Sequence, residues 1–316
     1  MKFNNEILDL ETKISELKNF SKEKKIDLSL EIEKLTKQRD EYLKSAYENL
    51  NDWDRVAIAR HPERPYTLDY IKNMTTDFVE LHGDRLCKDD PAIVGGLCKI
   101  DGKKVMIIGH QKGRSIEENL HRNFGMASPE GYRKALRLFR MAERFSIPIV
   151  NLIDTAGAYP GIEAEKHGQG EAIARNLLEM AGIKTPIISI VIGEGGSGGA
   201  LALGVADKVY MLENSVYSVI SPEGCAAILY KDSSKAPEAA NNLKISGKSL
   251  QSLGIIDGIV KEPLGGAHRD YKCAANDLKS VILSSLSELS KLDVDTLLKN
   301  RYNKFRKMGS FIEKTI

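Results

Sequence analysis

The chain has 316 residues, and its 46 lysines and arginines nearly balance 44 aspartates and glutamates, giving a formal net charge of +2. This balance argues against non-specific binding of nucleic acid, which needs a basic excess. The sequence has no apolar run long enough to predict a membrane span. Hydrophobic residues make up 42% of the chain, which is enough for a sizeable core. Because the N-terminus also lacks an apolar signal segment, we expect a cytoplasmic protein with no membrane or nucleic-acid partner.

The four cysteines stand far apart in the sequence, at positions 87, 98, 225 and 273. Cysteine-rich metal sites usually contain closely spaced pairs, and disulfide-stapled domains contain a denser set. We therefore expect reduced thiols and no metal on this chain.

Residues 1–50 contain no glycine or proline, and their apolar residues recur every three or four positions. This spacing predicts two amphipathic helices, and Asp27 in the polar stretch between them is a candidate N-cap for the second. The apolar stripe is too narrow to form a core. We expect a helical hairpin that either lies on its own domain or a partner chain, or stays a solvated decoration.

From about residue 91, short apolar runs alternate with helical patterns. The predicted strands are residues 92–100, 104–110, 147–154, 186–192 and 208–212. The predicted helices are residues 129–145, 168–181, 198–206 and 276–292, and a surface loop or short helix is expected around 231–242. Such alternation predicts an α/β fold with βαβ units and helical covers.

Two segments share the order of apolar strand, glycine-rich turn and helix. The first turn comprises residues 154–161 (DTAGAYPG), and the second turn comprises residues 193–199 (GEGGSGG). A glycine-rich turn at a helix start leaves backbone N–H groups without helical partners, and these groups favour negative charge. The sequence therefore predicts a site for a phosphate or an oxyanion.

The second turn fits three interpretations by itself. It matches the dinucleotide pattern GxGxxG, with Glu213 at a suitable distance. It also matches the nucleophile elbow GxSxG, with Ser197 as nucleophile and Asp257 and His268 as the later triad members. In the third interpretation the turn is an oxyanion site with no side-chain nucleophile, a hypothesis that also accounts for the first turn.

Longer motifs carry a more specific resemblance. They are RHPERPYTLDY (60–70), GDR (83–85), AIVGG (92–96), IIGHQKGR (107–114), NFGM (123–126), PEGYRKA (129–135), YSVISPEGC (217–225) and the two turns. With these motifs the chain resembles the alpha subunits of bacterial acetyl-CoA carboxylase carboxyltransferase. One departure is Ala156, which stands where the family's first turn usually has proline, so a fixed φ is lost there.

The resemblance implies a crotonase-like spiral domain over residues 51–265, between the hairpin (1–50) and a C-terminal helical segment (266–316). It implies transfer of the carboxyl group of carboxybiotin to acetyl-CoA, giving malonyl-CoA for fatty acid synthesis. The expected oxyanion donors to biotin are the backbone amides of Gly198 and Gly199, assisted by Gly157 or Ala158. Further expected biotin-site residues are Gly195, Gly196, Ala200, Tyr159 and Pro160.

The resemblance also implies partners. The chain lacks a biotin-attachment sequence, an ATP phosphate loop and a zinc ribbon. We therefore expect a separate biotin carboxyl carrier protein, a biotin carboxylase, and a zinc-bearing beta subunit in an α2β2 assembly. The alternative hypotheses are a non-catalytic subunit that only positions biotin and a crotonase-type acyl-CoA enzyme.

Basic residues allow more than one interpretation. Lys112 and Arg114 follow a predicted strand and are candidates for coenzyme A phosphates or acidic groups of the beta subunit, or else belong to a solvated loop. Four arginines recur on the helix predicted at 129–145, which is typical of a solvated or ion-paired face: Arg133, Arg137, Arg140 and Arg144. Glu223 is a candidate for the subunit interface.

Overall fold

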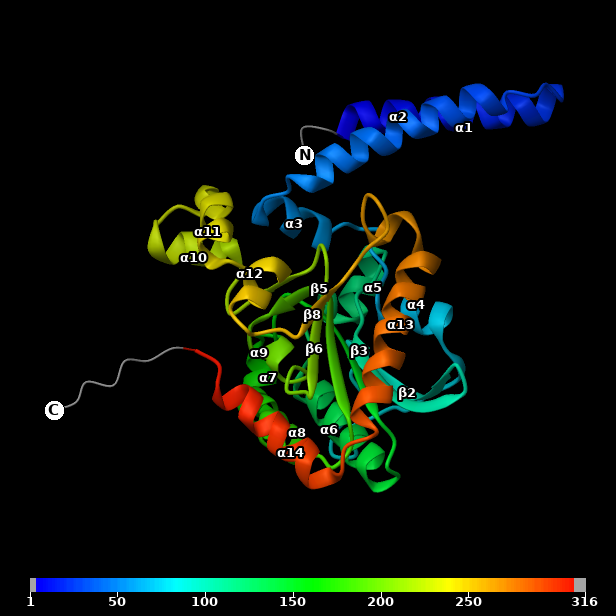
Figure 1. Cartoon of the computed structure of the whole chain (residues 1–316). Coiled ribbons are helices and arrows are strands. Elements are labelled where there is room, and N and C mark those ends of the chain that lie inside the picture. The colour runs from blue at the N-terminus through cyan, green and yellow to red at the C-terminus, as the bar shows by residue number, and fades with distance from the viewer. Residues whose placement is uncertain (1–3, 310–316) are drawn as a thin grey trace.

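An eight-stranded sheet lies at the centre of the computed structural model, which describes residues 4–309 (Figure 1). Its strand order is β1-β2-β3-β4-β5-β6-β8, and β7 pairs with the end of β5. The first three strands are antiparallel, and the pairs from β3 onward are parallel. The strands are β1 (Thr76–Glu80), β2 (Ile93–Ile100), β3 (Lys103–His110), β4 (Ile149–Thr155), β5 (Ile187–Gly196), β6 (Lys208–Leu212), β7 (Val216–Ser218) and β8 (Gly258–Val260).

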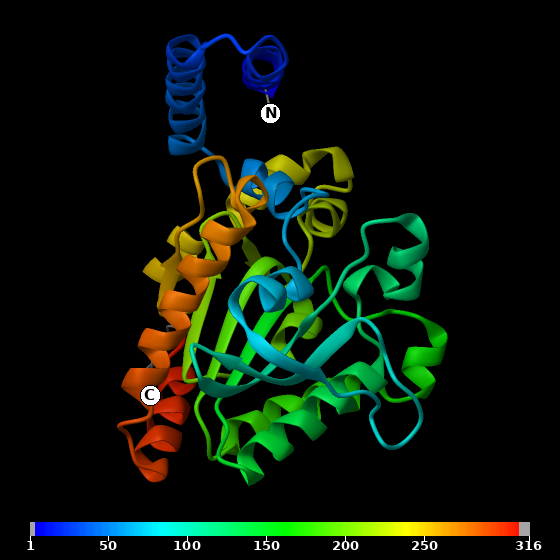
Figure 2. The ribbon, with the colours of Figure 1, turned by 90° about the vertical axis from the view of Figure 1, so that its right-hand side faces the viewer.

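Helices cover both faces of the sheet, so the central strands are buried on both sides. The helices α6 (Pro129–Arg144) and α8 (Gln169–Gly182) pack on one face, in a cluster that includes Ile108 and Ile153. The helices α4 (Thr67–Met74) and α13 (Tyr271–Leu289) pack on the other face. Figure 2 shows α13 and α6 on these opposite sides. Burial on two sides explains why the central strands read as continuous apolar runs.

The predicted N-terminal hairpin is confirmed as α1 (Asn4–Lys24) and α2 (Ser29–Glu48). Its helices lie side by side and stand away from the sheet (Figure 1). Ile7, Leu10 and Ile14 are buried, as the apolar stripe predicted. The predicted cap is displaced by one residue, because Leu28 is the N-cap while the Asp27 carboxylate accepts the Ser29 N–H at 3.0 Å.

The remaining helices are short except for the last. They are α3 (Asp52–Ala59), α5 (Ile116–His121), η1 (Asn123–Gly125), α7 (Ile162–Lys166), α9 (Ser197–Leu201), α10 (Pro222–Leu229), η2 (Ser233–Lys235), α11 (Ala236–Leu243), α12 (Gly247–Ser252), η3 (Ala267–Arg269) and α14 (Val294–Arg306). Within residues 4–309, no helix is both long and apolar enough to cross a bilayer.

Most of the predicted elements are confirmed, with three corrections. The strand predicted at 186–192 continues as β5 to Gly196, so the first four residues of the predicted second turn belong to the strand. The helix predicted at 198–206 ends at Leu201, where the chain turns and the Gly204 N–H donates to the Leu201 carbonyl. The C-terminal helix predicted at 276–292 begins earlier, at Tyr271, because Asp270 caps it by accepting the Cys273 N–H. Residues 1–3 of the predicted hairpin and 310–316 of the predicted C-terminal segment lie outside the described residues. The domain boundaries remain a prediction.

Candidate functional site

The two glycine-rich turns lie side by side at one edge of the sheet. They begin in the last residues of β4 and β5, which are neighbouring parallel strands that pair as far as Thr155 and Gly195, with a register shift after Ile153. The carboxyl ends of parallel strands meet at the same edge, where α/β proteins usually place their binding sites. Two turns separated by more than thirty residues of sequence therefore form one site.

Close packing of the two main chains explains the glycines. A β-carbon on Gly196 would lie 2.1 Å from the carbonyl oxygen of Ala156, and one on Gly199 would lie 2.6 Å from the carbonyl carbon of Gly157. Neither position can accept a side chain unless the backbone of the first turn moves. A β-carbon on Gly198 would instead meet only the Ile173 side chain, at an ordinary 3.4 Å.

The backbone amides at this edge differ in their availability. Gly198 and Gly199 lie in the first turn of α9, where N–H groups have no intrahelical acceptor, and no acceptor elsewhere in residues 4–309 takes them. The Gly157 N–H donates to Thr155 Oγ1 at 3.1 Å, so the expected openness of this amide is wrong. Ala158 is the remaining candidate donor of the first turn.

The other expected biotin-site residues separate into two groups. Gly195 and Gly196 line a groove together with Ala156, Arg60 and Pro222 at the start of α10. Ala200 is fully buried beneath the second turn. Tyr159 and Pro160 are not among the residues that line this groove, and the Tyr159 N–H donates to the Ala127 carbonyl at 3.0 Å.

Lys112 connects the two turns through an ion-pair network. Its Nζ lies 2.7 Å from Asp154 Oδ1 in the first turn and 3.1 Å from Glu194 Oε2 in the second. Asp154 Oδ1 also accepts the Glu194 N–H at 2.9 Å. Burial opposes the charge of Lys112, but the two carboxylates outweigh it and raise the pKa of the lysine. The side chain is 13% exposed, so the solvated-loop interpretation is wrong for this residue.

The network extends to neighbouring helices. Arg60, just after α3, pairs with Glu194 at 2.7 Å and with Glu223 of α10 at 2.6 Å. Arg114 pairs with Asp69 at 2.6 Å and stacks over the Tyr66 ring. Contacts of Lys112 or Arg114 with coenzyme A stay predictions. Both side chains already pair with carboxylates of this chain.

His110 at the end of β3 was missed by the sequence analysis. The residue is fully buried, and neither ring nitrogen has a hydrogen-bond partner among the described residues. Burial, with a smaller contribution from Lys112, lowers the pKa of His110 to about 3, so the ring is neutral at pH 7. It contacts Tyr132, whose hydroxyl lies beneath Gly199. No sequence signal distinguishes such a histidine from a core residue.

The arginine-bearing face of α6 is partly ion-paired and partly solvated, as predicted: Arg144 is exposed and forms no ion pair with the described residues. Arg133 pairs with Asp84 at 3.0 Å, Arg140 pairs with Glu179 at 2.8 Å, and Arg137 donates to the Gly83 carbonyl.

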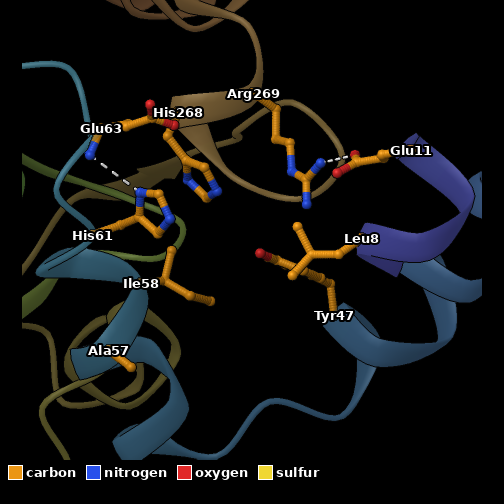
Figure 3. A pocket seen from close by; sticks show the side chains of 9 residues that line it. All are labelled: Leu8, Glu11, Tyr47, Ala57, Ile58, His61, Glu63, His268 and Arg269. Carbon is orange, nitrogen blue, oxygen red and sulfur yellow. Dashed lines mark hydrogen bonds and ion pairs between the residues drawn. The ribbon is translucent and has the colours of Figure 1, made fainter. Parts of the chain in front are cut away.

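The structure does not bring Ser197, His268 and Asp257 together as a triad. Ser197 lies at the second turn, whereas His268 stacks on His61 in a pocket beside the N-terminal hairpin, with a ring separation of 3.9 Å (Figure 3). Asp257 pairs with Lys304 instead. The dinucleotide interpretation is also weakened, because α9 is only five residues long.

Comparisons with known proteins point to one family. A family described as acetyl co-enzyme A carboxylase carboxyltransferase-like matches residues 1–309. An acetyl-coenzyme A carboxylase carboxyl transferase subunit alpha from Fusobacterium nucleatum is 70% identical over 98% of this chain and 99% of its own length. The protein of the same name from a Geobacillus species is 57% identical over 98% and 96%.

Solved structures support the predicted crotonase-like fold. Transcarboxylase 12S matches with a TM-score of 0.59 and 19% identity, over 72% of this chain and 43% of the transcarboxylase chain. The beta subunit of geranyl-CoA carboxylase from P. aeruginosa matches with a TM-score of 0.57 and 16% identity, over 83% and 47%. At these identities the likeness establishes the fold, and this chain spans less than half the length of either neighbour.

Proposed function

The chain belongs to the family of acetyl-CoA carboxylase carboxyl transferase alpha subunits, and from this membership we propose that its two glycine-rich turns stabilise the ureido oxygen of biotin. The family's reaction forms malonyl-CoA from acetyl-CoA for fatty acid synthesis, and it depends on biotin. Our proposal concerns which groups of this chain hold the biotin and which proteins complete the enzyme.

Negative charge is the central difficulty of carboxyl transfer. Carboxybiotin, when bound, supplies the carboxyl group and is left with negative charge on its ureido oxygen. Backbone N–H groups that already point at such an oxygen stabilise it without rearrangement, and loss of one donor typically lowers kcat by about 10²–10³. We assign this role to the amides of Gly198, Gly199 and Ala158.

One observation carries the assignment. The Gly198 and Gly199 N–H groups have no acceptor among the described residues, and Gly199 packs against the main chain of the first turn. A β-carbon on Gly199 would enter the space between the turns. The ion pairs of Lys112 with Asp154 and Glu194 hold the turns in this arrangement. Gly195 and Gly196 line the nearby groove, and we place the rest of the biotin ring at its mouth.

Exposed apolar side chains close to the turns support a partner at this edge. Ile116 on α5 is 80% exposed, Ile162 on α7 directly after the first turn is 76% exposed, and Leu229 on α10 is 66% exposed. Because the curated relatives are named as subunits, the chain works in a multi-subunit complex. We propose that a carboxyltransferase beta subunit, itself carrying zinc, covers these side chains in an α2β2 assembly and supplies the acetyl-CoA site.

The remaining partners follow from the chemistry. We propose that a separate carrier protein delivers carboxybiotin after a biotin carboxylase has charged it, and that the complex works in the cytoplasm. The crotonase-like unit at 51–265 would carry the biotin site, with the segments 1–50 and 266–316 as helical additions.

Co-expression with a beta subunit tests the proposal. We expect the two chains to co-purify and to convert acetyl-CoA and carboxybiotin to malonyl-CoA, whereas neither chain alone does so. A correctly assembled complex that produces no malonyl-CoA would overturn the assignment.

A further inference from the structure

Three side chains that commonly bind metals converge away from the glycine-rich turns. Cys87 lies in the loop between β1 and β2, Glu130 lies in the first turn of α6, and His167 ends α7. One ligand atom from each lies within 4.8 Å of the other two. His167 Nδ1 and Glu130 Oε1 are already 2.6 Å apart. Three segments distant in sequence thus present a thiol, a carboxylate and an imidazole to the same point.

A second observation shows that this cluster is incomplete. Glu130 is only 1% exposed, and its Oε2 atom has no hydrogen-bond partner among the described residues. A buried carboxylate oxygen without a partner carries a desolvation penalty that proteins normally avoid. Water, a proton donor or a cation at this point would remove that penalty, and the neighbouring thiol favours the cation.

We propose that Cys87, Glu130 and His167 bind one thiophilic divalent cation of the zinc class. Zinc takes thiolate, imidazole and carboxylate ligands at about 2.0–2.3 Å in a tetrahedral arrangement, often with water in the fourth position. In that geometry neighbouring ligand atoms are roughly 3.3–3.8 Å apart. Cys87 and His167 are both exposed, so small side-chain rotations bring the cluster to these distances.

The local charge permits such a cation. A thiolate and a carboxylate would neutralise its two positive charges. Arg133 lies 3.3 Å from Glu130, but it also pairs with Asp84 at 3.0 Å, so its charge is balanced on the far side. The site departs from the metal-free chain expected from cysteine spacing, because its ligands are far apart in sequence and meet only in the fold.

Binding would join the β1–β2 loop to α6 and to the segment after the first turn. It does not depend on the oxyanion assignment, since none of its ligands belongs to either turn. Cys273 provides a matched control: it is also exposed, and its Sγ lies 3.7 Å from Asp277 Oδ2 without a histidine in the cluster.

Cobalt titration of the full chain, purified without the beta subunit, tests the site. We expect one Co²⁺ per chain, a thiolate-to-cobalt charge-transfer band in the near ultraviolet, and loss of that band when Zn²⁺ is added. Cys273→Ser should leave the band unchanged. Cys87→Ser should abolish it and weaken cobalt binding by more than the roughly 10–100-fold that loss of an outer-shell group causes.

His167→Gln serves as a second variant at an exposed position, should Cys87→Ser fold poorly, and it should weaken binding to a similar degree. The proposal is overturned if the wild-type chain shows no thiolate band, if the band survives Cys87→Ser, or if Cys273→Ser is the change that removes it.

Discussion

Gly199 packs directly against the main chain of Ala158, so that a β-carbon on Gly199 would lie 2.7 Å from the Ala158 nitrogen. The amides of the two turns therefore hold their relative positions only while residue 199 has no side chain. Gly198, one residue earlier, has no such restriction. Substituting these two glycines therefore distinguishes two cases. In one, the donors depend on contact between the turns; in the other, any glycine in the second turn matters equally.

Gly199→Ala should lower the turnover of the assembled enzyme by about 10²–10³, the effect of losing one oxyanion donor, because the turns must separate to admit the methyl group. Gly198→Ala is the control: it keeps its N–H, has room beside Ile173, and should change kcat by only a few-fold. The measurement is malonyl-CoA formation by co-purified complexes of matched composition. If Gly199→Ala assembled with normal turnover, the subunit would be a scaffold that positions biotin without stabilising its charge.

Lys112→Met should destabilise the fold, since it leaves the buried Asp154 carboxylate without its cation and removes one of the two cations that pair with the half-buried Glu194. Removing one partner of a buried ion pair costs about 3–5 kcal/mol in the free energy of unfolding. Lys99→Met breaks the Lys99–Asp77 pair, whose lysine is 46% exposed, and should cost at most about 1 kcal/mol. Urea unfolding of both variants checks the difference, and equal losses would show that Lys112 does not organise the turns.

The sequence predicted the parts of this site that depend on local pattern. The second turn is predictable because six of the seven residues from 193 to 199 are glycine or serine. The strands β4 and β5 are predictable because both of their faces are buried, so their sequences are apolar runs without polar alternation. The strands β7 and β8, three residues each, are too short for any periodicity.

Contacts between distant residues could not be predicted in the same way. Lys112 meets Asp154 and Glu194 across 42 and 82 residues of sequence, and no spacing rule connects them. The bond from the Gly157 N–H to Thr155 Oγ1 is local, by contrast, and the tendency of threonine to bond backbone two residues ahead was a usable signal.

Ser197→Ala tests whether the second turn carries a nucleophile. Ser197 has a φ of 50° and an exposed position, as a nucleophile elbow would, but His268 and Asp257 lie elsewhere. We expect carboxyl transfer to stay within a few-fold of wild type. Hydrolysis of simple acyl esters should be at background for both proteins, and ester hydrolysis that disappears in Ser197→Ala would revive the hydrolase hypothesis.

Acidification should destabilise the fold partly through His268. Burial, with a smaller contribution from His61, lowers the pKa of His268 to about 4, and burial also lowers the pKa of His61. An unfolded histidine has a pKa of about 6.5, so between pH 6.5 and 4 the unfolded chain takes up a proton that the folded chain does not. Stability is therefore complete above pH 6.5 and falls as the pH approaches 4.

His268→Gln cannot take up this proton, so its midpoint of thermal unfolding should fall less than that of the wild type between pH 7 and 4.5. The comparison is of slopes rather than absolute midpoints, because the substitution also removes the stacking contact with His61. His121→Gln, at an exposed position on α5, should leave the slope unchanged. Parallel curves for the wild type and His268→Gln would mean that the pocket beside the hairpin opens and hydrates before His268 titrates.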